Sequence, residues 1–315
     1  MPSLEELWER LCRRRGFFWG LILVPLSVLY GLISRFSRLG KAQRVAGLKV
    51  ISVGNLSMGG SGKSPLVALL AGWHGRKKTA VLTRGYGSDE AAMLERALPH
   101  AKVLVNSDRL AAARQARVQG CEVAILDDGF QRRHQLERDL DILLLDWSRL
   151  DVERHCLPAG RLREPLSAAA DADAVLVTHA PLDYNREALR ACLPLAYQGL
   201  SVFRADHVPV ALRSLSGAKK PLSWLKGRRV TAMSGIGRPE GFEAALEALG
   251  AQVTSLRFSD HHAYRERDIP GAGVVICTAK DAAKLASVPI QCQLWVLEIE
   301  LRVSPEKEFK AMVLR

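Results

Sequence analysis

The chain has 315 residues, of which 25% are charged, and its formal net charge is +12 at pH 7. This length allows a sizeable buried core and favours two domains. A chain this basic suits acidic partners such as phosphorylated substrates or an anionic membrane. Only 6% of the residues are aromatic, and they do not alternate with basic residues, which argues against nucleic acid as a partner. Six scattered cysteines without a C-x-x-C pair indicate reduced thiols, neither a zinc site nor a disulfide framework, and no protein partner is identified.

The first predicted element is the long apolar run "GFFWGLILVPLSVLYGLI", at the lower edge of the length that crosses a bilayer. Arginines flank both ends, which argues against a clean crossing, and Pro25 would kink a spanning helix. No cleavage site for a secretory signal is evident. We therefore expect residues 1–38 to form a membrane-associated helix lying on the cytoplasmic face of a membrane. The alternative is a buried helix of the core.

Residues 39–210 then alternate between strand-like apolar runs and helical stretches. Continuous apolar strands separated by helices predict an α/β fold with a parallel sheet covered by helices on both faces. The segment from 196 to 227 breaks this rhythm and reads as a connector. A second, smaller α/β lobe is predicted for 211–315, where it would close a cleft. The six runs of the first lobe are "KVISV", "TAVLT", "AKVLV", "EVAIL", "DILLL" and "AVLVT".

The stretch "VGNLSMGGSGKSP" follows the first of these strands and has the pattern of a phosphate-binding P-loop. Ser57 replaces the usual first glycine, but the remaining pattern holds. Glycines let backbone N–H groups face phosphate oxygens, and the following helix directs its positive end at the same anion. Lys63 would contact the β- and γ-phosphates, and Ser64 would hold Mg²⁺. The expected nucleotide-binding residues are Ser57, Met58, Gly59, Gly60, Ser61, Gly62, Lys63 and Ser64.

Acidic residues end the apolar run "VAILDD". Carboxylates at the carboxyl end of a strand parallel to the P-loop strand point into the ligand crevice, so Asp127 or Asp128 is expected to hold Mg²⁺. The alternative is a polar strand end without a ligand. We count Lys63 and Asp128 among the catalytic residues.

From about Ser27 to Leu301 the chain resembles one family, the tetraacyldisaccharide 4′-kinases of lipid A synthesis. The Ser57 deviation is a trait of that family. The blocks that carry the resemblance are "VISVGNLSMGGSGKSP", "TRGYG", "DRLAAA", "ILDDGFQ", "RDLDILLLD", "LPAGRLREPL", "ADAVLVT", "SGIGRPEGF", "FSDHHAY" and "TAKDAAKL".

The resemblance implies that ATP, with Mg²⁺, donates its γ-phosphoryl group to the 4′-hydroxyl of a tetraacylated glucosamine disaccharide 1-phosphate. It also implies a P-loop NTPase-type lobe, a second α/β lobe with the nucleotide near their hinge, and an N-terminal membrane-associated helix. Such a lipid acceptor lies in a membrane, so we expect a peripheral or monotopic protein on the cytoplasmic side of the inner membrane. The anionic acceptor suits the basic chain.

In that family a His in an F-x-D-H block and an Asp-Glu pair after "RGY" carry the chemistry. The first block places the histidine at His261, with its neighbour His262 the weaker candidate. The acidic pair corresponds to Asp89 and Glu90, with Asp89 catalytic and Glu90 near the metal. The insertion usual before this pair is missing and Ala91 follows it, so a helix cap is an open alternative for Asp89.

A second departure is Arg132, which stands where the family usually has histidine. Arg132, Arg161 and Arg163 are candidates for contacts with the acceptor phosphate or lipid headgroups, and solvated surface arginines are the alternative. In "TAKDAAKL", Thr278, Lys280 and Asp281 either line the far lobe's side of the cleft or cap a helix.

Two other classes of protein remain as alternatives. A membrane-associated ATPase of the partitioning type also carries "GG-x-GK-[ST]", but its signature lysine precedes the two glycines, where this chain has Met58. A regulatory GTPase would need an N-K-x-D motif, and in "TAKD" Ala279 replaces the asparagine that reads guanine.

Overall fold

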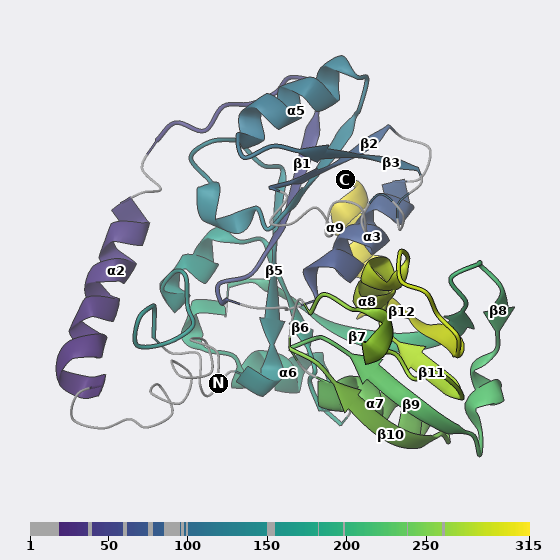
Figure 1. The fold of residues 1–315 in the computed structure, drawn as a ribbon. Helices are drawn as coiled ribbons and strands as arrows, with labels where there is room; N and C mark the ends of the chain where they lie inside the picture. The colour runs from purple at the N-terminus through teal and green to yellow at the C-terminus, as the bar shows by residue number, and fades with distance from the viewer. Residues whose placement is uncertain are drawn as a thin grey trace. The chain divides into compact units, whose positions relative to one another are not determined.

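A computed structural model describes residues 19–36, 40–58, 62–74, 78–84, 100–149, 155–181, 183–197, 199–237, 239–259 and 262–315, together with Glu95 and Leu98. The chain divides into two compact units. Unit 1 contains the chain up to residue 85, residues 98–206 and the C-terminal residues 303–315. Unit 2 contains residues 207–302 and the segment 86–97. Each unit is an α/β assembly, as the sequence predicts (Figure 1).

The sheet of unit 1 is parallel throughout the pairings of its first seven strands. In space the strands run β3-β2-β4-β1-β5-β6-β7. All six strands predicted from apolar runs are confirmed. The central strands are buried on both faces and therefore read as unbroken hydrophobic segments, whereas β3 lies at the edge and is only partly buried. These are β1 (Lys49–Gly54), β2 (Thr79–Thr83), β3 (Ala101–Val105), β4 (Val123–Asp127), β5 (Leu140–Asp146) and β6 (Ala174–Thr178).

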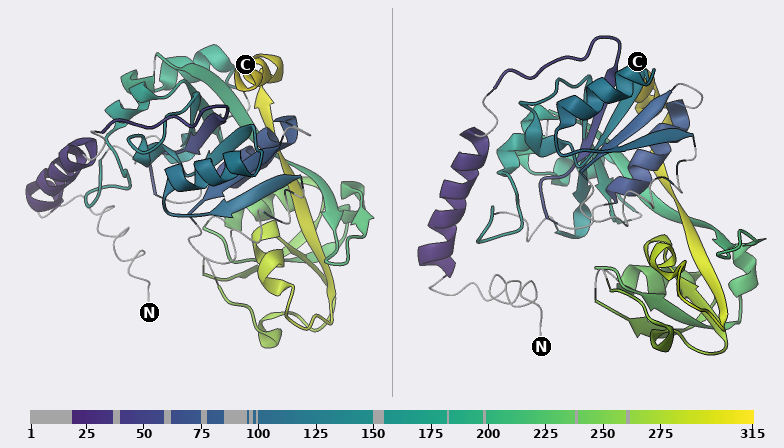
Figure 2. Two further views of the ribbon diagram at one scale, coloured as in Figure 1. Left: turned by 90° about the horizontal axis from the view of Figure 1, so that it is seen from above. Right: turned by 45° about the horizontal axis from the view of Figure 1, so that its top comes forward.

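Helices cover both faces of this sheet (Figure 2). On one face, α5 (Arg109–Val118) buries three alanines against β1, β2 and β4. It begins at Asp108, whose side chain accepts hydrogen bonds from the Leu110 and Ala111 amides as an N-cap. On the other face, α3 (Lys63–His74) packs its leucines and Val67 against the same three strands. The P-loop helix is thus anchored directly on the strands that carry the site.

A further core of unit 1 lies beside β5 and β6. It contains the 3₁₀ turn Leu166–Asp171 and residues flanking α6 (Arg186–Cys192), which begins at the N-cap Asn185. Tyr197 is the largest fully buried side chain of this cluster. This core supports the segment around residue 162 that returns to the P-loop.

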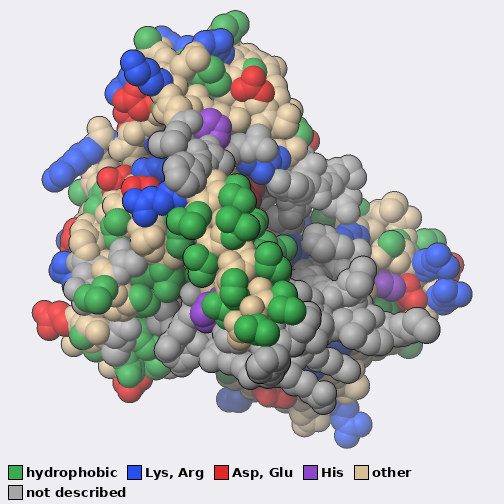
Figure 3. Space-filling view, turned by 90° about the vertical axis from the view of Figure 1, so that its left-hand side faces the viewer, with side chains coloured by type: hydrophobic (Ala, Val, Ile, Leu, Met, Phe, Trp, Pro, Cys, Tyr) green, Lys and Arg blue, Asp and Glu red, His purple; other side chains and the backbone are tan. Residues whose placement is uncertain are grey.

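At the N-terminal side, a π-helical turn (Trp19–Leu23) leads into α2 (Val24–Phe36). Most of its apolar side chains are exposed, and Figure 3 shows them gathered over one face of the molecule. Among the residues that the structure describes, no helix is long and apolar enough to cross a bilayer.

The chain passes from unit 1 to unit 2 within β7 (Ser201–Arg213) and returns within β12 (Gln293–Ser304). The sequence predicts that the region from 196 to 227 is a connector. This prediction is wrong for residues 201–213, which form the thirteen-residue strand β7. Polar residues such as Arg204 and Asp206 interrupt its apolar pattern. Their side chains pair with each other at 2.7 Å, so they lie at the strand without breaking it.

The C-terminal helix α9 (Glu306–Leu314) belongs to unit 1, whereas the sequence places it with the second lobe. Its Phe309 is fully buried, 5.6 Å from the Trp73 ring of α3 and 4.9 Å from the Phe203 ring of β7. Lys49 of β1 donates a hydrogen bond to the Val313 carbonyl at 2.6 Å. These contacts fix α9 behind the P-loop helix.

The strands of unit 2 pair in parallel in the order β10-β9-β11-β12. A short strand β8 (Lys219–Lys220) pairs antiparallel with β7. The remaining elements of the unit are β9 (Arg229–Ser234), α7 (Pro239–Ala248), β10 (Gln252–Arg257), β11 (Val274–Cys277) and α8 (Ala279–Leu285).

Candidate functional site

The P-loop segment connects β1, which ends at Gly54, to α3, which begins at Lys63. Gly62 adopts a φ of +81°, a left-handed conformation that glycine takes without steric cost, directly before the first helical turn. At the start of the loop, the Met58 amide donates a hydrogen bond to the Arg161 carbonyl at 2.8 Å. Ser57 is buried and bridges to Leu162. The predicted residues Gly59, Gly60 and Ser61 lie outside the described part of the chain.

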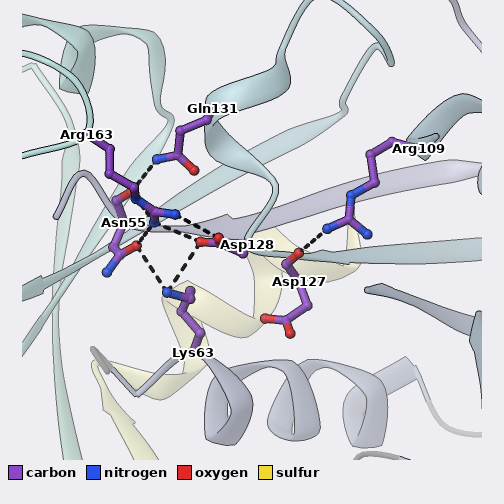
Figure 4. Close-up of polar contacts among 7 residues, drawn as sticks. All are labelled: Asn55, Lys63, Arg109, Asp127, Asp128, Gln131 and Arg163. Atoms are coloured by element: carbon purple, nitrogen blue, oxygen red, sulfur yellow. Dashed lines mark hydrogen bonds and ion pairs between the residues drawn. The ribbon is translucent and has the colours of Figure 1, made fainter. Parts of the chain in front are cut away.

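Lys63 directs its ammonium group at two acceptors at the carboxyl end of the sheet (Figure 4). Its Nζ lies 3.3 Å from Asp128 Oδ1 and donates a hydrogen bond to Asn55 Oδ1 at 3.1 Å. Asp128 directly follows β4, which is the parallel neighbour of β1, so both ends of the contact come from adjacent strands. The lysine is therefore oriented by these two side chains.

Arg163 completes this cluster from the segment that follows residue 155. Its guanidinium donates to both carboxylate oxygens of Asp128, at 2.8 and 2.9 Å, and also to the Asn55 side-chain oxygen. Such a bidentate pair fixes direction as well as charge. Gln131 donates to the Asn55 carbonyl at 2.7 Å. Sequence reasoning missed Asn55 and Gln131, although both lie within the blocks "VGNLS" and "DDGFQ".

The backbone of Asp128 has a φ of +53°, which is uncommon for residues other than glycine and which asparagine and aspartate tolerate best. Burial by itself would raise the pKa of Asp128, but the hydrogen bond from Arg163 and the charges of Lys63 and Arg163 outweigh it. The net result is a pKa well below the ordinary range of aspartate. Asp128 is therefore a permanent anion that holds two cations at the P-loop.

Asp127, the last residue of β4, points in a different direction from Asp128 and makes different contacts. Figure 4 shows its carboxylate directed toward α3, away from the Arg163 guanidinium. Its backbone carbonyl accepts a hydrogen bond from Arg109 at 2.7 Å. Arg109 is only 2% exposed, so a buried cation fixes the end of the acidic strand. In the sequence, Arg109 directly follows the helix cap Asp108, and an arginine at such a position is usually exposed. Its contact with the Asp127 carbonyl was therefore not predicted.

Several predicted site residues fall where the structure gives no description. Asp89, Glu90 and His261 lie outside the described residues, as does the side chain of Arg132. Arg161 is described and supplies the backbone carbonyl that accepts from Met58. Of the predicted residues, the structure thus brings together Lys63, Asp128 and Arg163, with Asp128 paired to both cations.

The described part of the "FSDHHAY" block lies in unit 2. His262 stacks on Phe258, with ring centroids 4.5 Å apart, and its Nε2 lies 3.1 Å from Asp268 Oδ2. Tyr264 packs edge-on against both rings. His262 is therefore part of a cluster with Phe258, Tyr264 and Asp268.

The "TAKD" segment opens α8 and serves it as a cap. The Thr278 hydroxyl donates to Asp281 at 2.6 Å, and Thr278 is the N-cap of the helix. Asp281 is fully buried and accepts further hydrogen bonds from the Tyr264 hydroxyl at 2.8 Å and from the Gly235 amide at 3.0 Å. Of the two readings that the sequence left open for this segment, these contacts support the capping role for Thr278 and Asp281.

Within the described ranges, no group of three or more His, Cys, Asp or Glu side chains is close enough to form a metal centre on its own. Mg²⁺ in nucleotide-dependent enzymes is usually held by one or two protein oxygens together with substrate phosphates. Oxygen donors of that kind are present in the Asp127 carboxylate and in the hydroxyl of Ser64, in the first turn of α3.

A lysine at the start of a helix, facing the acidic end of the neighbouring parallel strand, defines a P-loop protein of the phosphotransferase and NTPase class. The family model described as tetraacyldisaccharide-1-P 4′-kinase matches residues 19–315. The chain therefore belongs to the tetraacyldisaccharide-1-P 4′-kinase family.

Relatives cover most of the chain. A tetraacyldisaccharide 4′-kinase of Anaeromyxobacter dehalogenans is 40% identical, over 90% of this chain and 86% of the relative. A protein of the same name from Thiobacillus denitrificans is 36% identical, over 98% and 97%. Among solved structures, that of the "apo" form of LpxK from Aquifex aeolicus in complex with ATP aligns with a TM-score of 0.76 and 30% identity, covering 92% of this chain and 97% of that one.

Proposed function

We propose that the protein transfers the γ-phosphoryl group of ATP to the 4′-hydroxyl of a tetraacylated glucosamine disaccharide 1-phosphate in lipid A biosynthesis. The observation that carries this proposal is the cluster of Lys63, Arg163 and Asp128 at the start of the P-loop helix, in a chain of this kinase family. Two cations beside a helix N-terminus suit the negative charge of a triphosphate.

Nucleotide binding follows from the same cluster. The N-terminus of α3 and the left-handed Gly62 present backbone amides to phosphate oxygens, and Lys63 supplies a positive charge that Asn55 and Asp128 orient. The related structure holds ATP, and adenine nucleotide suits this chain because it lacks the guanine-reading motif.

For magnesium, we propose the Ser64 hydroxyl and the Asp127 carboxylate as the protein oxygens, with Glu90 a further candidate. Both oxygens of Asp128 are already held by Arg163, which favours Asp127 over Asp128 for this role. When bound with the nucleotide, Mg²⁺ neutralises charge on the β- and γ-phosphates. Asp128 would act by holding Lys63 and Arg163 in place.

For the acceptor, we propose that the dyad of Asp89 and His261 removes the proton of the 4′-hydroxyl. The freed oxygen forms a bond to the γ-phosphorus as the bond to the β-phosphate oxygen breaks and ADP leaves. Lys63 remains beside the phosphates throughout, so its charge stabilises the transferring group. The assignment of Asp89 and His261 rests on the sequence blocks that they occupy.

Replacing His261 with alanine should lower kcat by about a hundredfold or more, because a positioned acid–base group contributes on that order. Steady-state kinetics with ATP and the lipid acceptor measure kcat and KM separately. His100→Ala, which removes an exposed histidine of unit 1, serves as the control and should retain full activity. A loss confined to KM would show that His261 binds substrate and takes no proton.

The direct test is incubation of the protein with ATP and the tetraacylated disaccharide 1-phosphate, followed by mass analysis of the lipid. We expect one added phosphate with ATP. A parallel reaction with GTP as the donor should give no phosphorylated lipid. Stimulated ATP hydrolysis without a phosphorylated lipid would favour a partitioning-type ATPase and would exclude the kinase.

The apolar face of α2 is proposed as the membrane contact on the cytoplasmic side of the inner membrane. In α2, Ile33 is 59% exposed and Leu29 53%, and Leu21 of the preceding turn is 61% exposed. Arg35 lies in the last turn of α2, where it can meet anionic headgroups. The protein must bind a lipid acceptor at the surface of a bilayer. Burial of each of these apolar side chains in that bilayer would contribute about 1.5–3 kcal/mol to the free energy of membrane binding.

The double substitution Leu29→Glu and Ile33→Glu should therefore reduce co-sedimentation with phosphatidylglycerol vesicles by more than about tenfold, since charged side chains resist transfer into hydrocarbon. Leu195→Glu is the matched control, because Leu195 is an exposed leucine of the same unit at 82%. Wild-type sedimentation of the double variant would place the membrane contact elsewhere.

A further inference from the structure

The helix α2 touches the rest of unit 1 through a narrow stripe. Ser27 and Gly31, one helical turn apart, are buried, whereas the side chains on either side of them are exposed. The Ser27 hydroxyl donates a hydrogen bond to the Cys156 carbonyl at 2.6 Å. A Cβ at Gly31 would lie 3.5 Å from Cys156 Sγ and 4.0 Å from Pro165 Cδ, so the helix backbone rests directly on both ends of the segment 155–165.

This segment, here called the 155–165 loop, is a closed turn. The Leu157 amide donates to the Leu162 carbonyl at 2.9 Å, and the Leu162 amide donates to the His155 carbonyl at 3.1 Å. The two ends of the loop are thereby tied together. A displacement of Cys156 is consequently transmitted to the residues just after Leu162.

The outgoing end of the 155–165 loop is bound to the approach of the P-loop. The Arg163 amide donates to the Leu56 carbonyl at 2.7 Å, and the Met58 amide donates to the Arg161 carbonyl at 2.8 Å. Arg163 then places its guanidinium on Asp128. Hydrogen bonds, joined by the backbone of the 155–165 loop, therefore connect α2 to the cations of the P-loop.

Electrostatic proximity agrees with this arrangement. Partial burial raises the pKa of the Tyr30 hydroxyl on α2, the nearby Cys156 and Glu164 raise it further, and the charge of Arg163 lowers it. Tyr30 is therefore near enough to Arg163 and Glu164 to sense their charges. The inner side of α2 faces the residues that deliver Arg163 to the site.

We propose that Ser27 is a positioning residue for phosphoryl transfer: by holding the Cys156 carbonyl it seats the 155–165 loop and thereby orients Arg163 toward Asp128. This inference rests on the transfer activity proposed above. The proposed membrane face lies on the opposite side of the same helix. When α2 is bound to a bilayer, it therefore also holds the 155–165 loop in place. The transfer site then has its active geometry at the membrane, where the lipid acceptor lies.

Kinetics with ATP and the lipid acceptor test the proposal. Ser27→Ala should lower kcat about three- to tenfold, the order expected from loss of one buried hydrogen bond, with KM for the lipid and vesicle sedimentation unchanged. The matched control is Ser34→Ala on the same helix, whose hydroxyl donates to the Gly31 carbonyl at 2.8 Å within the helix itself, and it should retain wild-type kcat.

A double-mutant cycle separates positioning from general stability. Arg163→Lys keeps the charge but loses the guanidinium fork, so Ser27→Ala added to it should cause little further loss. If Ser27→Ala lowers kcat by the same factor in both backgrounds, or has no effect in either, Ser27 does not act through Arg163 and the proposal is overturned.

A second measurement is independent of catalysis, so it holds even if the disaccharide kinase assay fails. Burial raises the pKa of the Cys156 thiol to about 11, and α2 covers it. Alkylation of Cys156 by iodoacetamide at pH 8, followed by peptide mass analysis, should be about fivefold faster in Ser27→Ala than in wild type or Ser34→Ala. Equal labelling in all three proteins would show that the hydroxyl does not seat the loop.

Discussion

Replacing Lys63 with alanine should lower kcat/KM by about a thousandfold or more, because a cation that stabilises the transferring phosphoryl group is worth that order of rate. Lys63 is only 17% exposed at its side chain and is aimed by Asn55 and Asp128 at the start of the P-loop helix. Alanine cannot replace the charge, and Arg163 is already committed to Asp128 at 2.8 and 2.9 Å.

The measurement is steady-state transfer of labelled phosphate from ATP to the lipid acceptor. Lys102→Ala is a suitable control, because Lys102 is a lysine of the same unit that donates to the Gln119 carbonyl at 3.2 Å on the exposed side of the fold. Circular dichroism of both variants should match wild type. Near-normal turnover of Lys63→Ala would show that the P-loop lysine takes no part in phosphoryl transfer.

Asp128→Asn should reduce kcat by about a hundredfold, since it leaves Lys63 and Arg163 as two adjacent cations without the anion that aligns them. Asparagine tolerates the left-handed conformation of this residue, which has a φ of +53°, so the variant tests the charge and adds little backbone strain. Glu308→Gln removes an exposed carboxylate paired with Arg186 at 2.6 Å and should remain fully active.

The pH dependence gives this prediction a second readout. The folded pKa of Asp128 is depressed, so its ion pairs are fully formed above the ordinary aspartate range and are lost only as pH falls below that range. An acid limb of the rate profile near neutral pH must arise from another group. Asp128→Asn should therefore lower the plateau of the profile without moving its acid limb, and a shifted limb would contradict the assignment.

The strands of unit 1 could be predicted because central parallel strands are apolar along their whole length, as in "DILLL" of β5. β7 could not, because it passes out of the first unit and carries Arg204 and Asp206, whose pairing is visible only in three dimensions. The position of α9 was hidden for a similar reason. Its contact with Trp73 joins residues far apart in the chain, and no local pattern reports such a contact.

At the site, Lys63 and Asp128 could be predicted from motif spacing, since a strand-to-helix glycine loop and an acidic strand end have few other uses in combination. Asn55 and Gln131 escaped because neutral amides act here through single hydrogen bonds that depend on the exact turn of the backbone. Arg163 was one of three arginines with equal claims, and only the fold shows that it reaches Asp128.

Unit 1 is assembled from pieces of sequence that lie on both sides of unit 2. Residues 303–315 supply Phe309, which fills space beside Trp73 and Phe203, so the P-loop lobe lacks part of its interior until these residues have left the ribosome. Residues 207–302 are contiguous and emerge earlier. During synthesis the contiguous part of unit 2 can thus reach its native state before unit 1 is complete.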